Sequence, residues 1–237
     1  MDDMLPAQLA RMGYAEPISL LERAAIDRYR ASFDESLAAS GGKPEPHDLS
    51  GYHLKHRWAY ELATTPALLD RISSVLGPDL VLWASHFWYK PPFSEDRVPW
   101  HCDAVYWPVL NRDIHLTAWI ALSASDRGNG CLRMIPGSHR TVPHDTQLQD
   151  PTALSLPIAD LEMAPGQVTF FSGYLFHGSE GNMSASPRIG YALRFSTPAV
   201  RFDEVQVKSG FNYLRSILVR GTDRYHHNDF MAAPPPF

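Results

Sequence analysis

The 237-residue chain is 44% hydrophobic and 20% charged, which is the composition of an ordinary globular protein. Its net charge of -5 argues against a surface for nucleic acid or anionic membranes, and its two cysteines are too few for a disulfide framework. With an acidic N-terminus and no long apolar run, it is expected to be a single cytoplasmic domain over residues 1–237 without a membrane partner.

Helices are predicted in the first third of the chain. Residues 17–38 place apolar side chains at helical spacing, and two glycines follow as a stop signal. A second helix is expected to begin at Pro66, since proline suits the first helical turn, and to end at Gly77. Residues 1–78 are therefore expected to form a helical N-terminal part.

Short β-prone segments, separated by turn-forming clusters, follow from Leu80. They are VLWASHFWY (81–89), HLTAWIALS (115–123), CLRMI (131–135), QVTFF (167–171) and RIGYALRF (188–195). This all-β pattern predicts an antiparallel sandwich or jelly roll, buttressed by the N-terminal helices. We expect the jelly-roll core to cover residues 79–200 and a C-terminal tail or flap to cover 201–237.

The sharpest local feature is the segment Trp100-His101-Cys102-Asp103. Side chains alternate along an extended segment, so His101 and Asp103 project together while Cys102 points the other way. An imidazole and a carboxylate on one face can supply two metal ligands. A second histidine would complete a 2-His-1-carboxylate set, which leaves positions open for a chelating cosubstrate and O2. A surface or capping pair is the simpler alternative for an isolated triplet.

A second group of candidates follows the predicted strand 167–171. His177 comes at the end of a strand and a turn, as a site residue would, and Arg188 starts the next predicted strand. Gly190 and Ala192 share the face of Arg188, so these small residues would leave room for a ligand beside the guanidinium. The planar guanidinium suits a dicarboxylate, although a surface arginine is the alternative.

Together these residues resemble the phytanoyl-CoA dioxygenase family of Fe(II)/2-oxoglutarate oxygenases. The resemblance covers roughly Gly51 to Asp223 and includes PWHCDAVYWP, AWIALSASDRGNGCLRMIPGSHR, FHGSEGNMSASPRIGYALRFSTP and LVRGTDRY. It implies a double-stranded β-helix, a cupin-like jelly-roll barrel whose open end holds the iron.

The resemblance also implies roles for individual residues. The implied ligands of Fe(II) are His101, Asp103 and His177. At the far carboxylate of 2-oxoglutarate, the implied contacts are Arg188 and Ser179. Trp119 and His86 are implied to line the cosubstrate pocket. His53 matches a position near the entrance of the site. Cys102 departs from the family pattern, which has glutamine there, so the resemblance does not carry over any bond of that glutamine to the cosubstrate or to a metal ligand.

Three further residues are candidate substrate contacts. Tyr106 and Trp107 follow Asp103 closely, although aromatic residues of a barrel are equally often core. Arg133, in the segment 131–135, could meet an anionic group of the substrate, with a structural salt bridge as the alternative.

The implied function is hydroxylation of an unactivated C–H bond of a small-molecule metabolite or natural-product intermediate, coupled to conversion of 2-oxoglutarate and O2 to succinate and CO2. The carboxylate of Asp103 disfavours halogenation, because related halogenases replace it with a small residue. Desaturation, epimerisation and ring closure stay open, since the fate of a radical depends on substrate geometry.

Two other classes of protein are the alternatives: a non-catalytic barrel that binds a metal or 2-oxoglutarate, and a zinc hydrolase. Hydrolysis needs no group such as Arg188 to hold a dicarboxylate. Monomer and homodimer are both open.

Overall fold

A computed structural model describes residues 4–42, 44, 49–107, 115–141, 151–202 and 215–236. The chain divides into two compact units. The first unit comprises Met1–Ser19, Trp88–Trp107 and Thr117–Gly190, and the second comprises Leu20–Phe87, Pro108–Leu116 and Tyr191–Phe237. The expectation of a single domain over 1–237, with boundaries near 78 and 200, stays a prediction.

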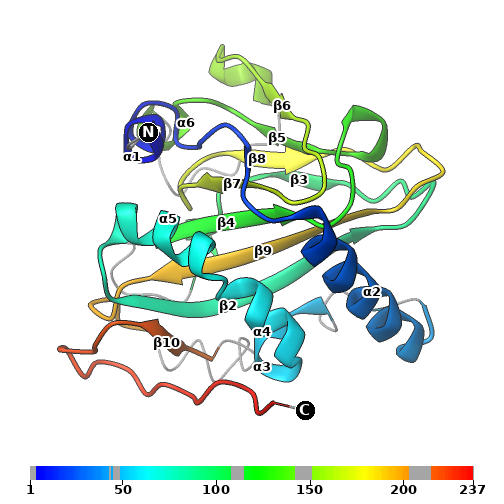
Figure 1. Cartoon of the computed structure of the whole chain (residues 1–237). Helices are drawn as coiled ribbons and strands as arrows, with labels where there is room; N and C mark the ends of the chain where they lie inside the picture. Colours follow the sequence, from blue (N-terminus) through cyan, green and yellow to red (C-terminus); the bar gives the residue numbers. More distant parts are fainter. Residues whose placement is uncertain are drawn as a thin grey trace. The chain divides into compact units, whose positions relative to one another are not determined.

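The strands form two sheets (Figure 1). The larger sheet has the order β1-β7-β4-β9-β2-β10 and the smaller β3-β8-β5-β6. Their bounds are β1 (Ile18–Ser19), β2 (Leu80–Lys90), β3 (Val98–His101), β4 (His115–Ala121), β5 (Leu132–Met134), β6 (Ala159–Leu161), β7 (Gln167–Phe171), β8 (His177–Ser179), β9 (Arg188–Ser196) and β10 (Ile217–Arg220). Six strand pairs are antiparallel: β1–β7, β2–β10, β4–β7, β3–β8, β5–β8 and β5–β6. Together with the N-terminal helices, they confirm the predicted jelly-roll class.

The helices differ in part from those expected. They are α1 (Met4–Met12), α2 (Arg23–Ala39), α3 (Tyr52–Lys55), α4 (Arg57–Ala63), α5 (Pro66–Leu76) and α6 (Ser138–Thr141). The predicted helix over 17–38 begins only at Arg23, because Ile18 and Ser19 pair with the backbone of β7. The second predicted helix is confirmed as α5, with proline in its first turn. No helix of the described residues is long and apolar enough to cross a membrane.

In the first unit, strand register decides which side chains meet. β3 and β5 both pair with β8, so His101 and Met134 each lie opposite His177. In the larger sheet β4 pairs with β7, which places Thr117 opposite Phe171. Every residue of β4 is buried, as its almost unbroken apolar sequence predicts.

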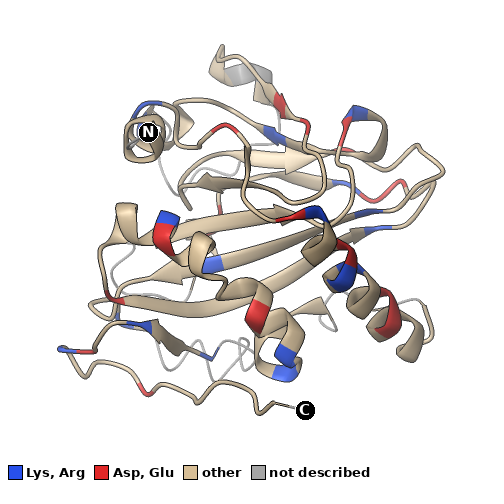
Figure 2. Ribbon diagram, in the orientation of Figure 1, with Lys and Arg blue, Asp and Glu red and all other residues tan. Residues whose placement is uncertain are grey.

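In the second unit, helices α2, α3 and α4 enclose aromatic side chains. The ring of Phe87 stacks on Tyr191 at 4.0 Å between centroids, and Phe33, Tyr52 and Trp58 lie within 6 Å of it. The solvent side of α2 carries basic and acidic residues in turn (Figure 2), joined as i,i+4 ion pairs. Burial of the aromatic rings, rather than these exposed pairs, holds α2 in place.

Candidate metal and cosubstrate site

Three side chains in the first unit form a 2-His-1-carboxylate triad. His101 ends β3, Asp103 opens the 3-10 turn Asp103–Val105, and His177 opens β8. The two imidazole rings are 4.3 Å apart between centroids. One ligand atom from each residue lies within 4.8 Å of the others, so a single ion can bind all three.

The orientation of both histidines suits a metal. Nδ1 of His101 lies 2.8 Å from the carbonyl oxygen of Pro99, and Nδ1 of His177 lies 2.9 Å from that of Leu175. A carbonyl only accepts, so Nδ1 carries the proton in each ring and the lone pair is on Nε2. Nε2 of His101 is 3.5 Å from Oδ1 of Asp103. Two neutral imidazoles and a buried carboxylate fit divalent iron.

Cys102 lies between two of the ligands and points away from them. It is 1% exposed and packs with Ile135 and Phe176 in a separate apolar cluster. The alternation expected along this segment is therefore confirmed, and the thiol fills a hydrophobic site.

Arg188 is a fully buried cation at the start of β9. It is 1% exposed, it donates to Oγ of Ser179 at 3.5 Å, and its Nε has no hydrogen-bond partner among the described residues. No carboxylate among the described residues pairs with it, and burial lowers its pKa to about 10. A buried guanidinium without an anion is unfavourable, so this arrangement favours binding of an anionic ligand.

Trp119, on β4, forms one wall beside this guanidinium. Its ring centroid is 5.7 Å from Cζ of Arg188, and within the described part of the chain its buried Nε1 has no hydrogen-bond partner. A Cβ atom on Gly190 would lie only 1.8 Å from the indole. The expectation that Gly190 leaves room for a ligand is therefore wrong, because Trp119 fills that room.

Lys90 is a second buried cation, to which sequence analysis gave no role. It ends β2, is 4% exposed, and donates from Nζ to the backbone oxygen of Asp96. Burial and then the charge of Arg188 lower its pKa to about 8, against the opposite influence of Asp96 and Glu180. The two cations meet because β2, which ends at Lys90, lies beside β9, which begins at Arg188. They are far apart in the sequence, so no motif along the chain could have revealed the pair.

The two aromatic residues after Asp103 are placed differently. Tyr106 is 52% exposed, with its ring centroid 6.2 Å from that of His101. Trp107 is 5% exposed, and its ring covers Gly173 so closely that a Cβ there would lie 2.2 Å from it. Tyr106 is thus available beside the triad, whereas Trp107 packs against Gly173, in the connection between β7 and β8.

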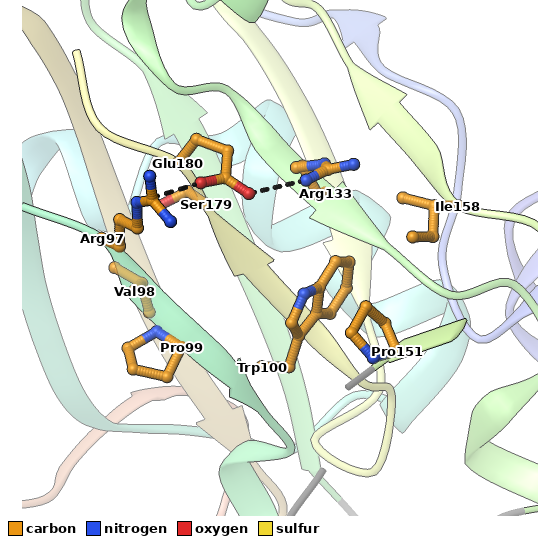
Figure 3. Close-up of a pocket in the computed structure, with 9 residues that line it drawn as sticks. All are labelled: Arg97, Val98, Pro99, Trp100, Arg133, Pro151, Ile158, Ser179 and Glu180. Carbon is orange, nitrogen blue, oxygen red and sulfur yellow. Dashed lines mark hydrogen bonds and ion pairs between the residues drawn. The ribbon is translucent and has the colours of Figure 1, made fainter. Parts of the chain in front are cut away.

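Arg133 makes structural ion pairs. It lies opposite Gly178, while the next residue, Met134, lies opposite His177, so Arg133 points to the other face of the smaller sheet. Its guanidinium pairs with Asp160 at 2.9 Å and Glu180 at 2.8 Å. Its guanidinium lies over the Trp100 ring, and both side chains line the cavity drawn in Figure 3. The volume of this cavity is about 390 Å³. The salt-bridge alternative is the one observed.

His53 and His86 belong to the second unit. Nδ1 of His53 lies 2.7 Å from Oγ of Ser85, and Nδ1 of His86 lies 2.8 Å from Oγ of Ser50. His53 is fully buried, which lowers its pKa to about 4. Their expected places at the site entrance and in the cosubstrate pocket stay predictions.

Comparison with known proteins gives a consistent result. The family model for phytanoyl-CoA dioxygenase (PhyH) matches residues 10–190. Peroxisomal phytanoyl-CoA dioxygenase of Rattus norvegicus is 26% identical over 185 residues, which cover 70% of this chain and 54% of the rat protein. Ectoine dioxygenase of Sphingopyxis alaskensis is 26% identical over 218 residues, covering 80% of this chain and 71% of that enzyme.

Among solved structures, the nickel complex of the non-heme monooxygenase ThoJ aligns with a TM-score of 0.80 and 25% identity. The alignment covers 98% of this chain and 89% of ThoJ. The chain spans about half the length of the mammalian phytanoyl-CoA dioxygenases that it matches.

Proposed function

The chain belongs to the phytanoyl-CoA dioxygenase family, and we propose that it is an Fe(II)- and 2-oxoglutarate-dependent dioxygenase that hydroxylates an unactivated C–H bond of a small molecule. In this proposal His101, Asp103 and His177 bind the iron. The observation that carries the use of 2-oxoglutarate is the buried guanidinium of Arg188, which pairs with no carboxylate of the described residues and lies in the same unit as the triad.

The chain's own residues position and shield the reactants. Arg188, with the hydroxyl of Ser179, would hold the far carboxylate of 2-oxoglutarate, and Lys90 would add a second positive charge. The indole N–H of Trp119 is a further donor within this wall. Bound Fe(II) and 2-oxoglutarate would supply the chemistry that activates O2 and releases succinate and CO2.

Other residues would act on the substrate side. The ring of Phe171 lies 4.9 Å from that of His177 and would keep water from this ligand. Tyr106, exposed beside His101, is the proposed substrate contact. Trp107 and Arg133 are less suited to that role, because the first is packed over Gly173 and the second is held in ion pairs.

The proposed substrate is a metabolite or a natural-product intermediate. The matched relatives are named for different compounds, phytanoyl-CoA and ectoine. Membership of the family therefore does not identify the substrate of this chain. Desaturation, epimerisation or ring closure would use the same site with a different substrate geometry. The rat relative is peroxisomal by name, whereas the cytoplasm proposed for this chain rests on its sequence.

Two other classes are less favoured. A zinc hydrolase could use the same three ligands, but it has no use for two buried cations that pair with no carboxylate of the residues described. A non-catalytic barrel would not need a triad that leaves coordination positions open.

The test is turnover of 2-oxoglutarate. Purified protein with Fe(II), ascorbate and O2 is expected to release succinate slowly without substrate and faster with a substrate from a panel of acyl-CoA and small polar compounds. His177→Ala should abolish both rates. No succinate from iron-loaded wild type under any of these conditions would contradict the proposal.

A further inference from the structure

A buried threonine of the larger sheet contacts the carboxylate of the triad. Thr117, on β4, is 0% exposed, and its hydroxyl lies 3.5 Å from Oδ2 of Asp103. The other carboxylate oxygen, Oδ1, lies 3.5 Å from Nε2 of His101. The two oxygens of Asp103 therefore have different neighbours: one faces the metal-binding nitrogen and the other faces a hydroxyl donor.

The hydroxyl of Thr117 has few possible hydrogen-bond partners. Within the part of the chain that the structure describes, Asp103 is its one side-chain hydrogen-bond partner. The separation is long for an O–H···O bond, but a hydroxyl enclosed in an apolar strand is unfavourable without any acceptor. The contact therefore orients both partners.

Thr169, on the adjacent strand β7, provides the comparison. It is also 0% exposed, and its hydroxyl donates to the backbone oxygen of Ala15 at 2.7 Å. Such a bond to a main-chain carbonyl is what a purely structural buried threonine makes. Thr117 instead reaches a residue of the metal triad.

The register of β4 and β7 adds a second support. Phe171 lies directly opposite Thr117, and its ring is 4.9 Å from that of His177. In this cross-strand pair, Thr117 contacts Asp103 and Phe171 contacts His177, so the pair reaches two of the three ligands. Both ligands come from other elements of the first unit. Side chains directly opposite on antiparallel strands share a face, so the register fixes both contacts at once.

We propose that Thr117 is a positioning residue that holds Oδ2 of Asp103 away from the metal, so that the carboxylate binds through Oδ1 alone. This inference rests on the proposed function. Two imidazoles and one carboxylate oxygen leave three positions of an octahedral ion open, which is enough for a chelating 2-oxo acid and O2 together. If both oxygens bound, one of these positions would be lost.

The test compares metal binding by variants that differ in one hydroxyl. Thr117→Val removes the donor and keeps the shape, Thr117→Ser keeps the donor, and Thr169→Val is the matched control. Anaerobic titration with Co(II), followed by its visible absorption, reports both affinity and ligand geometry. We expect Thr117→Val to bind Co(II) about 10- to 100-fold more weakly with an altered spectrum. Thr117→Ser and Thr169→Val should match the wild type.

The outcomes separate this inference from the proposed function. Equal affinity and spectrum for Thr117→Val and wild type would overturn the role of Thr117 alone. If the valine variant does not fold, Thr117→Ala and Thr117→Ser form a second pair: weak binding only by alanine supports the role, and equal binding overturns it. No Co(II) binding by wild type would overturn both proposals. Metal binding without any effect of added 2-oxoglutarate would overturn the proposed function only.

Discussion

At the scale of single residues, the protein places cations where a folded chain ordinarily avoids them. Arg188 and Lys90 are both buried, and no carboxylate of the described residues forms an ion pair with either. Desolvation is the main cause of both lowered pKa values. Such unfavourable burial is typical of binding sites, where a ligand supplies the missing charge.

Arg188→Met tests this view of the guanidinium. A methionine has similar length and no charge to desolvate, so the ligand-free variant should be more stable to urea than wild type by about 1 kcal/mol or more. It should bind 2-oxoglutarate at least about 30-fold more weakly, since losing a buried charge partner costs about 2 kcal/mol or more. Arg194→Met, on the same strand, is the control. A clear loss of stability in Arg188→Met would mean that the guanidinium is structural.

His53 should make the fold sensitive to acid. Its pKa is about 4 in the folded chain, because of burial, against 6.5 for the free side chain. Between these values the unfolded chain binds a proton that the folded chain does not, so stability falls as pH falls from 6.5 to 4, by roughly 3 kcal/mol.

Urea unfolding of wild type and His53→Gln at pH 7.5 and 4.5 measures this difference. The variant should lose less stability on acidification, whereas His226→Gln, at an exposed position, should behave as wild type. Parallel losses in wild type and His53→Gln would show that acid acts elsewhere.

At the scale of secondary structure, the apolar strands were predictable, the short β5 among them, but the two short strands that carry the histidines of the triad were not. β7 was predicted with its observed bounds, and β2, β4 and β9 within two residues, because their apolar runs are long. β3 and β8 have four and three residues, contain polar side chains, and exist because they pair with each other. These two strands carry both histidines of the triad, so pairing rather than local sequence builds the site.

Gly190 shows how one element shapes the site on another. Gly190→Ala should push the Trp119 ring from its place beside Arg188, because the new Cβ would overlap the indole. We expect a loss of about 1–3 kcal/mol in unfolding free energy and weaker binding of 2-oxoglutarate. Gly128→Ala, where the nearest heavy atom is 3.2 Å away, is the control. Wild-type binding by Gly190→Ala would mean that Trp119 does not shape the pocket.

At the scale of the whole molecule, the sequence predicted the fold class and the residues of the triad. Those residues lie in motifs that are continuous in sequence and resemble one family over most of the chain. The parts that sequence reasoning missed depend on which face of a strand a side chain occupies. Arg133 lies on a predicted strand and Lys90 directly follows one, yet Arg133 is held by ion pairs and Lys90 is buried beside Arg188. Periodicity gives alternation but not which face is inside.

The most direct test of the account is anaerobic titration of Fe(II) and then 2-oxoglutarate into the purified protein. Binding of the 2-oxo acid to iron held by two histidines and a carboxylate is expected to produce a visible metal-to-ligand charge-transfer band. The band should be lost in His177→Ala and weakened in Arg188→Ala. Iron binding by the wild type with no band at saturating 2-oxoglutarate would contradict the proposed function.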